Sequence, residues 1–429
     1  MSKLAINGGK AIRTKLFPSQ NTMDEKEESA VIKAMKNGRL SGYRGNWCNE
    51  FYGGPEIQRL EKTFKEKFNS NHAIAVNSCT SGLQIACGAI GLQPGDEVIV
   101  TPYSMTCSAT APMIFGATPV FADIEKDYYC LDPDSVESKI TDKTKAIIVV
   151  SLFGQPYDPR INEIAYEHNL IVIEDAAQAI GSTYKNNYAG ILGDIGVFSF
   201  NYGKHLTCGE GGMIVAHDDF LAMKCRLVSN HAEAVIDGMN KESRFTANPY
   251  IRQKNMVGFN MRMTELNAAI LSEQLKKLDK IIEQRIENVT YLNARLSQIP
   301  AISISPVREN CTHTYYVLSY QWDQDKADGL HRDEFTEAVK AELTSRQDRE
   351  GEGIPIGNGY ITPLYKMPLF NYPDDICPVC EDLSYNKLFL TLYHAPNSTL
   401  ADMYDVANAF EKCWENRNEI KDDNFILLK

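Results

Sequence analysis

The sequence predicts an α/β fold with a mostly parallel central sheet in a three-layer large domain, followed by a smaller α+β C-terminal domain. Short apolar runs typical of buried strands recur between residues 73 and 200, and helix-like stretches or longer connections separate most of them. This alternation is typical of a parallel sheet that helices cover on both faces. A chain of 429 residues also exceeds the size at which one core usually stops growing, so we expect two domains.

The elements of the large domain follow from the spacing of apolar residues. The positions of Ile57, Leu60 and Phe64 predict an amphipathic helix over residues 57–68. Further helices are expected at 25–36, 83–90 and 161–168, and strands at 73–76, 98–100, 120–121, 146–150, 170–173 and 197–200. In sheets of this kind, ligands bind outside the carboxyl ends of the strands.

The C-terminal part begins with a long helical pattern over residues 263–296, which carries a stripe of leucine, isoleucine and valine. We interpret it as a core-facing helix that bridges the two domains. Beyond it, a strand is expected at 315–320 and helices at 331–343 and 400–414. We therefore assign residues 1–285, including an N-terminal arm, to the large domain and residues 286–429 to the small one.

Composition excludes several classes of partner. The net charge of −12 argues against nucleic acid or an anionic membrane as the main partner. No apolar run approaches the roughly 20 residues that span a bilayer, and the first residues lack the apolar core of a signal peptide. We expect a cytoplasmic protein with reduced cysteines. Cys377 and Cys380 lack a second Cys or His pair, so we predict incidental thiols and no metal site.

Two unusual segments point to chemistry. Lys204 lies between the apolar run 195–200 and a glycine-rich turn, a placement that presents its amine to a crevice. Upstream, Asp175 ends a run that otherwise has the composition of a buried strand. A buried carboxylate with a lysine downstream suggests pyridoxal phosphate, where the lysine forms a Schiff base and the carboxylate holds the pyridinium nitrogen.

A third segment, Asn77 to Gly82, lies between a predicted strand and a predicted helix. The backbone N–H groups of a helix start, with the hydroxyls of Thr80 and Ser81 beside them, suit an anion such as the cofactor phosphate. The same residues also suit a simple helix cap, since Ser and Thr prefer that position.

Together these motifs resemble those of the DegT/DnrJ/EryC1/StrS family, sugar and cyclitol aminotransferases of the fold-type I pyridoxal phosphate group. The resemblance runs over nearly the whole chain, from residues 4–10 to the C-terminal helix. It is densest at 174–178, 199–212 and 258–265. The family implies pyridoxal 5'-phosphate as the cofactor, a fold-type I large domain and a homodimer.

The resemblance assigns roles to single residues. Lys204 would form the Schiff base, Asp175 would keep the ring nitrogen protonated, and Gln178 would hydrogen-bond to the ring hydroxyl oxygen. Ser199 would donate to the phosphate together with Thr80 and Ser81. Asn260 would reach the phosphate from the neighbouring subunit, so the active site would be shared across a dimer interface. Alternatively, Asn260 is a turn residue.

The chain departs from the family pattern at two positions. Met105 stands where the family usually places an aromatic residue over the cofactor ring, and a thioether can still contact that π-face. Ile180 stands where histidine is frequent. Lys204 itself separates the chain from the dehydratase branch, in which histidine replaces the lysine. Arg262 and Arg308 either meet an anionic substrate or form structural ion pairs.

The resemblance implies a two-stage transamination. L-Glutamate or L-glutamine would donate an amino group, and the keto group of a nucleotide-linked keto sugar would accept it. A keto cyclitol of the inosose type is the alternative acceptor, because residues 353–365 resemble the corresponding segment of inosamine-type members. A non-catalytic sensor that keeps the cofactor, and another pyridoxal phosphate reaction, are further alternatives.

Overall fold

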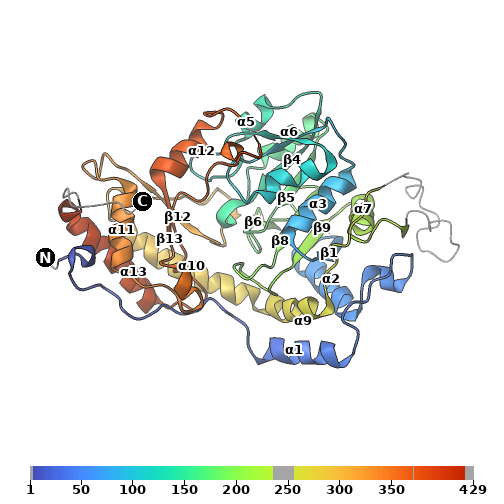
Figure 1. Ribbon diagram of the computed structural model, residues 1–429, viewed down its shortest axis with the longest axis horizontal. Coiled ribbons are helices and arrows are strands. Elements are labelled where there is room, and N and C mark those ends of the chain that lie inside the picture. Colours follow the sequence, from blue (N-terminus) through green and yellow to red (C-terminus); the bar gives the residue numbers. More distant parts are fainter. Residues whose placement is uncertain (1–2, 235–255, 371, 421–429) are drawn as a thin grey trace.

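The computed structural model describes residues 3–234, 256–370 and 372–420. Its main element is a seven-stranded sheet that is parallel except for β9, which runs antiparallel to both of its neighbours (Figure 1). The strands follow the order β1 (His72–Val76), β9 (Gly212–Ala216), β8 (Ile195–Ser199), β5 (Ile171–Asp175), β4 (Thr144–Val150), β2 (Glu97–Val100) and β3 (Thr118–Phe121). This confirms the predicted α/β fold with a mostly parallel sheet.

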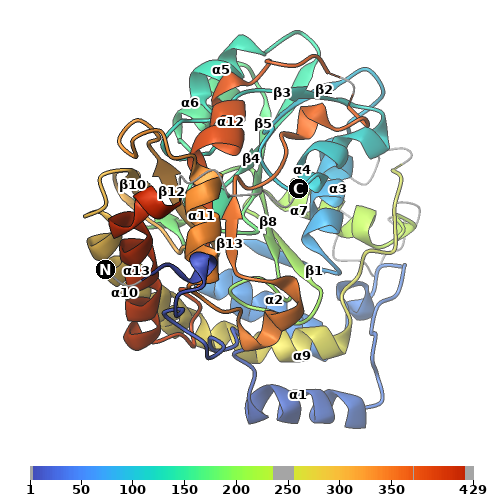
Figure 2. The ribbon, with the colours of Figure 1, turned by 60° about the vertical axis from the view of Figure 1, so that its left-hand side comes forward.

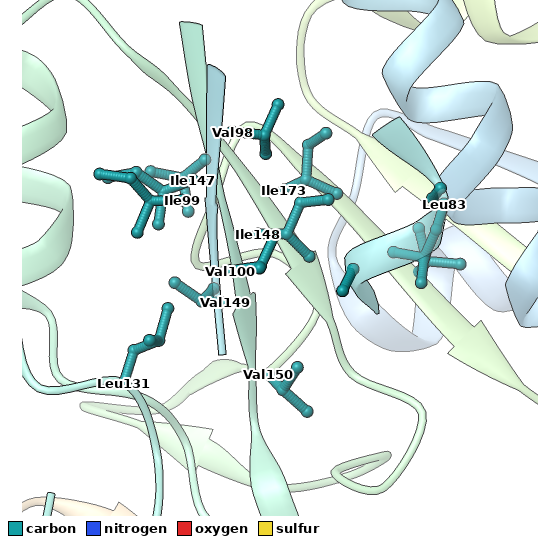
Figure 3. Packing of buried hydrophobic residues seen from close by; sticks show 14 of the residues in the cluster. Leu83, Val98, Ile99, Val100, Leu131, Ile147, Ile148, Val149, Val150 and Ile173 are labelled. Atoms are coloured by element: carbon teal, nitrogen blue, oxygen red, sulfur yellow. The ribbon is translucent and has the colours of Figure 1, made fainter. Parts of the chain in front are cut away.

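The central strands are apolar along their whole length because both faces of the sheet are buried. In β4, Ile148 lies on the face toward Leu83 of α3 (Cys79–Ile90), whereas Ile147 and Val149 lie on the opposite face (Figure 3). All four side chains are fully buried in one apolar cluster. Continuous rather than alternating apolar runs are what such double coverage produces.

Helices form the outer layers of this part. At the β1 end of the sheet, α3 and α7 (Asp219–Ser229) share an apolar cluster with one face, while α2 (Pro55–Phe68) and α9 (Glu265–Gln274) share a cluster with the other. The remaining helices here are α1 (Glu25–Lys36), which lies beside α9 (Figure 2), α4 (Cys107–Thr110), α5 (Pro133–Ser138) and α6 (Arg160–Glu167). The two helical layers and the sheet between them make up the three layers that the sequence predicts.

A second, antiparallel sheet forms in the C-terminal part, in the order β10 (Ile302–Ile304), β12 (Leu318–Trp322), β14 (Leu388–Thr391) and β13 (Ile356–Asn358). It packs in one cluster with α10 (Leu278–Leu296), α11 (Arg332–Ala341) and α13 (Leu400–Glu415). Short elements complete the chain: α12 (Pro378–Asp382) and a small sheet of β6 (Thr183–Tyr184), β7 (Asn187–Tyr188) and β11 (Cys311–Thr312).

The N-terminal arm belongs to this second core, because Leu4 and Phe17 are fully buried in its apolar cluster. The long pattern over 263–296 is two helices, α9 and α10, joined by a short 3-10 turn at Leu275–Lys277. Since α10 runs through residues 285 and 286 without a break, the division that we placed there remains a proposal.

Candidate functional site

The residues that the sequence singled out lie at the carboxyl ends of neighbouring strands. Asp175 is the last residue of β5 and Ser199 the last residue of β8, and these two strands pair in parallel. Ser199 is in register with Gly212 of β9. A side chain on Gly212 would come within 2.6 Å of the Ser78 carbonyl carbon, so α3 begins directly against this edge. Strand ends of this kind form the usual ligand crevice of an α/β sheet.

Asp175 is a buried carboxylate, only 3% exposed. Its Oδ1 accepts a hydrogen bond from the Ala177 N–H (3.1 Å) and its Oδ2 accepts one from the Ser108 hydroxyl (3.0 Å). Burial raises the pKa of Asp175, and these hydrogen bonds and the charge of Lys204 oppose that rise. Within the described part of the chain Asp175 forms no salt bridge, so its negative charge calls for a cationic partner.

Lys204 lies in the turn that follows β8. Its backbone N–H donates to the Asn201 carbonyl (3.0 Å), and the Gly203 N–H donates to the Asn201 side chain (3.2 Å), which fixes the turn. The Lys204 Nζ lies 4.2 Å from the centre of the Tyr316 ring. No carboxylate of residues 3–234, 256–370 or 372–420 forms a salt bridge with it. The amine is therefore available to a bound molecule.

The start of α3 offers hydroxyl and N–H groups. Ser78 caps the helix, since its Oγ accepts from the Ser81 N–H (3.1 Å) and donates to the Ser81 hydroxyl (3.0 Å). Thr80 is exposed and its hydroxyl hydrogen-bonds to Cys107. Ser199 Oγ accepts from the Asn201 N–H (3.4 Å). The cap predicted as the simpler alternative exists, but Ser78 provides it, which leaves the hydroxyls of Ser81 and Ser199 with donor capacity.

Gln178 is held firmly within the protein. Its Oε1 accepts from the Phe153 N–H (2.8 Å) and its Nε2 donates to the Tyr360 hydroxyl (2.9 Å). One N–H of its amide remains for another acceptor. Met105, in contrast, is 56% exposed, so its thioether is accessible from the surface.

The remaining candidates have structural partners. Asn260 is exposed, and its Oδ1 accepts from Arg262 Nε (2.9 Å). Arg308 forms ion pairs with Glu125 and, at 3.0 Å, with Asp158. Of the two alternatives for Arg308, the structural ion pair is therefore the one observed.

Sequence reasoning missed a second group of residues beside Lys204. Arg285, Arg346 and Arg349 line a cavity of about 290 Å³, together with Gly203 and Tyr316. Nothing in the local sequence marks these arginines: Arg285 occupies one position in a long helical pattern, and the other two lie in the irregular segment 346–352. Only the fold brings them to Lys204.

This donor set fits pyridoxal phosphate. Asp175 is a buried anion without a cation, Lys204 is an amine without a carboxylate, and the start of α3 supplies donors for a phosphate. A protonated ring nitrogen would neutralise Asp175. Among the described residues there is no group of three or more His, Cys, Asp or Glu side chains that could hold a metal ion. None of the described helices is long and apolar enough to cross a membrane.

Comparison with known proteins identifies the family. The model of the DegT/DnrJ/EryC1/StrS aminotransferase family matches residues 23–411. The spore coat polysaccharide biosynthesis protein SpsC of Bacillus subtilis is 36% identical over 402 residues, covering 92% of this chain and 97% of SpsC. The L-glutamine:2-deoxy-scyllo-inosose aminotransferase of Streptomyces kanamyceticus is 30% identical and covers 97% of this chain and 98% of its own length.

Solved structures agree with this assignment. DesI, crystallised in the presence of its TDP-sugar product, superposes with a TM-score of 0.81 at 27% identity and covers 97% of each chain. The fold is thus that of the fold-type I transferases, and the cofactor is pyridoxal phosphate. The chain therefore belongs to the DegT/DnrJ/EryC1/StrS family and is a pyridoxal phosphate-dependent aminotransferase of the sugar and cyclitol type.

Proposed function

We propose that this enzyme transfers the amino group of L-glutamate or L-glutamine to the keto group of a nucleotide-linked keto sugar. The observation that carries the proposal is that two groups without salt-bridge partners among the described residues come from neighbouring strands. They are the amine of Lys204, in the turn after β8, and the buried carboxylate of Asp175, at the end of β5. When bound, pyridoxal phosphate supplies an electron sink for the carbon that loses its proton. The proton transfer and the contact with the ring nitrogen are proposed for Lys204 and Asp175.

Lys204 is the proposed proton carrier. Its Nζ removes the proton from the α-carbon of the donor and returns a proton during the second stage. The Tyr316 ring, 4.2 Å away, restricts where the amine can move. Asp175 is proposed to hold the ring nitrogen in its protonated form. Its raised pKa reflects burial that the hydrogen bonds and the charge of Lys204 offset only in part, and a positive charge at that nitrogen would lower the pKa and keep the carboxylate ionised.

Other residues are proposed to position the cofactor. Thr80, Ser81 and Ser199 would donate to the phosphate at the start of α3, where the helix dipole favours an anion. Gln178, already oriented by Tyr360, would use its remaining N–H on the ring hydroxyl oxygen. The exposed Met105 would cover the ring from the solvent side, as a thioether in place of an aromatic side chain.

We further propose a homodimer with shared active sites. The exposure of Asn260 supports this, because its side chain could reach a neighbouring subunit. Mixing Lys204→Ala and Asn260→Ala subunits tests it. If the sites are shared, each hybrid contains one site with both residues intact and recovers activity. Activity equal to the average of the two parents would contradict a shared site.

The proposal also specifies which keto compound accepts the amino group. The TDP-sugar product of DesI supports a nucleotide-linked sugar. The similarity to an inosose aminotransferase over 97% of this chain favours a keto cyclitol as the second candidate. The test is to load the enzyme with pyridoxamine phosphate and offer either a TDP-linked keto sugar or 2-deoxy-scyllo-inosose. Amination of the nucleotide sugar is expected; amination of the cyclitol alone would establish the second candidate.

A further inference from the structure

The cavity beside Lys204 is rich in positive charge. Three guanidinium groups line it, those of Arg285, Arg346 and Arg349, while Glu352 is the acidic residue among its lining side chains. Arg349 pairs with Glu352 at 3.2 Å, and Arg346 lies 3.3 Å from Asp348. The protein as a whole carries a net charge of −12, so this concentration of cations is a local feature.

Arg285 is the least compensated of the three cations. It is 3% exposed, its Nη1 donates to the Tyr315 carbonyl (3.1 Å), and its Nε has no hydrogen-bond partner. Within the described part of the chain no carboxylate forms a salt bridge with it. Burial and then the charge of Arg346 lower the pKa of Arg285 to about 10. A buried cation of this kind favours binding of an anion.

The position of the cavity relates this charge to the reaction. Gly203, the residue before Lys204, and Tyr316, whose ring faces the Lys204 amine, both contribute to its lining. A ligand in the cavity therefore has its anionic group at the arginines and can extend toward Lys204. The volume of about 290 Å³ lies at the lower end of the range for ligand pockets and suits an amino acid better than a whole nucleotide sugar.

The chemistry of the walls agrees with an amino acid. Ile354, Ile356 and Leu390 line the cavity beside the arginines. Apolar side chains of this kind can cover the methylene groups of a glutamate or glutamine side chain, while guanidinium groups form two parallel hydrogen bonds with a carboxylate. We propose that Arg285 and Arg346 bind a carboxylate of the amino-acid donor in this cavity. The proposal rests on the proposed function, since it specifies where the donor of that reaction is held.

Binding of an unreactive dicarboxylate tests the proposal without turnover. Glutarate is titrated calorimetrically into the pyridoxal phosphate-loaded protein. Loss of a charge-assisted hydrogen bond predicts that Arg346→Ala raises the Kd of glutarate about tenfold to hundredfold. Asp348→Asn removes the carboxylate that competes for Arg346, so it is expected to lower the Kd. Arg346→Lys serves where Arg346→Ala does not fold, and a loss of at least severalfold is expected there.

Arg332→Lys is the matched control, because Arg332 is equally buried but donates to the carbonyls of Ser384, Tyr385 and Leu388 away from the cavity. It should leave the Kd of glutarate unchanged. An unchanged Kd in folded Arg346 variants overturns the proposal. Inorganic pyrophosphate is titrated in parallel: if its binding depends on Arg346 and that of glutarate does not, the cavity holds the phosphates of the acceptor and the donor assignment is wrong.

The proposed function and the proposed carboxylate site can be refuted independently of each other. If wild-type protein converts no amino donor to its 2-oxo acid, the proposed function is refuted, and glutarate binding still reports on Arg346. If wild-type protein performs the conversion while the Kd of glutarate is independent of Arg346, only the carboxylate site is refuted. A raised KM for L-glutamate in Arg346→Lys, with the visible spectrum of the bound cofactor unchanged, would support the site.

Discussion

Asp175→Asn separates the stability of the empty protein from its affinity for the cofactor. The carboxylate is buried and accepts hydrogen bonds from the Ala177 N–H and the Ser108 hydroxyl, yet its pKa is raised because burial disfavours the charged form. A carboxylate whose pKa is higher in the folded than in the unfolded chain destabilises the fold above its unfolded pKa. Asparagine removes that charge and retains one acceptor oxygen. We therefore expect the empty variant to be at least as stable as the wild type.

The cofactor-bound protein should behave in the opposite way. Loss of the charge-assisted contact to the ring nitrogen removes about 1.5–3 kcal/mol of binding free energy, which raises the Kd for pyridoxal phosphate about tenfold to hundredfold. Ligand-induced stabilisation falls by the same amount at a fixed saturating concentration. For a chain of 429 residues, the entropy of unfolding converts this loss to a decrease of about 2–3 °C in the shift of Tm.

Thermal unfolding with and without pyridoxal phosphate measures both effects. Asp123→Asn is the matched control, because Asp123 also has a raised pKa from burial and accepts from the N–H groups of Val379 (2.9 Å) and Cys380 (3.0 Å), outside the site. Its cofactor-induced shift should equal that of the wild type. If Asp175→Asn shows the full wild-type shift, Asp175 does not hold the ring nitrogen and the reasoning is wrong.

Two further predictions concern the fold. His394 is fully buried beside Arg285, and burial lowers its pKa from 6.5 to about 3, so below pH 6.5 the unfolded chain binds a proton that the folded chain does not. The free energy of unfolding should therefore fall as the pH drops, and His394→Asn should weaken this fall by about 1.4 kcal/mol per pH unit, measured by urea unfolding between pH 5 and 6. The same pH dependence in the variant and the wild type would contradict the lowered pKa of His394. A side chain on Gly82 would overlap Val197, so Gly82→Ala should cost about 1–3 kcal/mol, whereas Gly351→Ala, which meets no atom within 4 Å, should cost much less. Equal urea midpoints for the two alanine variants would refute the packing argument.

Much of the fold could be predicted because apolar spacing reports burial directly. The continuous apolar run of β4 and the periodic pattern of α2 correspond to their elements within a few residues. β9 was not among the predicted strands; it follows directly on the glycine-rich turn at 209–211. The sequence pattern also did not indicate the break between α9 and α10, because one apolar stripe continues from the first helix to the second through Leu275 and Leu278.

The candidate site was only partly predictable. Asp175 could be placed at a strand end from its local sequence, because it terminates a buried run, whereas the apolar run that contains Ser199 continues to the buried Phe200, one residue beyond the end of β8. The arginines of the cavity could not, because Arg285 and Arg346 come from segments about 60 residues apart that meet only in the folded chain. Residues 235–255, which precede Asn260, lie outside the described part of the chain.

A single-turnover experiment tests the central claim, that Lys204 carries the proton in an amino transfer. Purified protein loaded with pyridoxal phosphate is mixed with L-glutamate or L-glutamine, and the 2-oxo acid released is measured by mass spectrometry. The wild type should release one equivalent per active site, whereas Lys204→Ala should release none on the same timescale while circular dichroism shows an unchanged fold. Equal release from both proteins would contradict the role of Lys204 and with it the proposed mechanism.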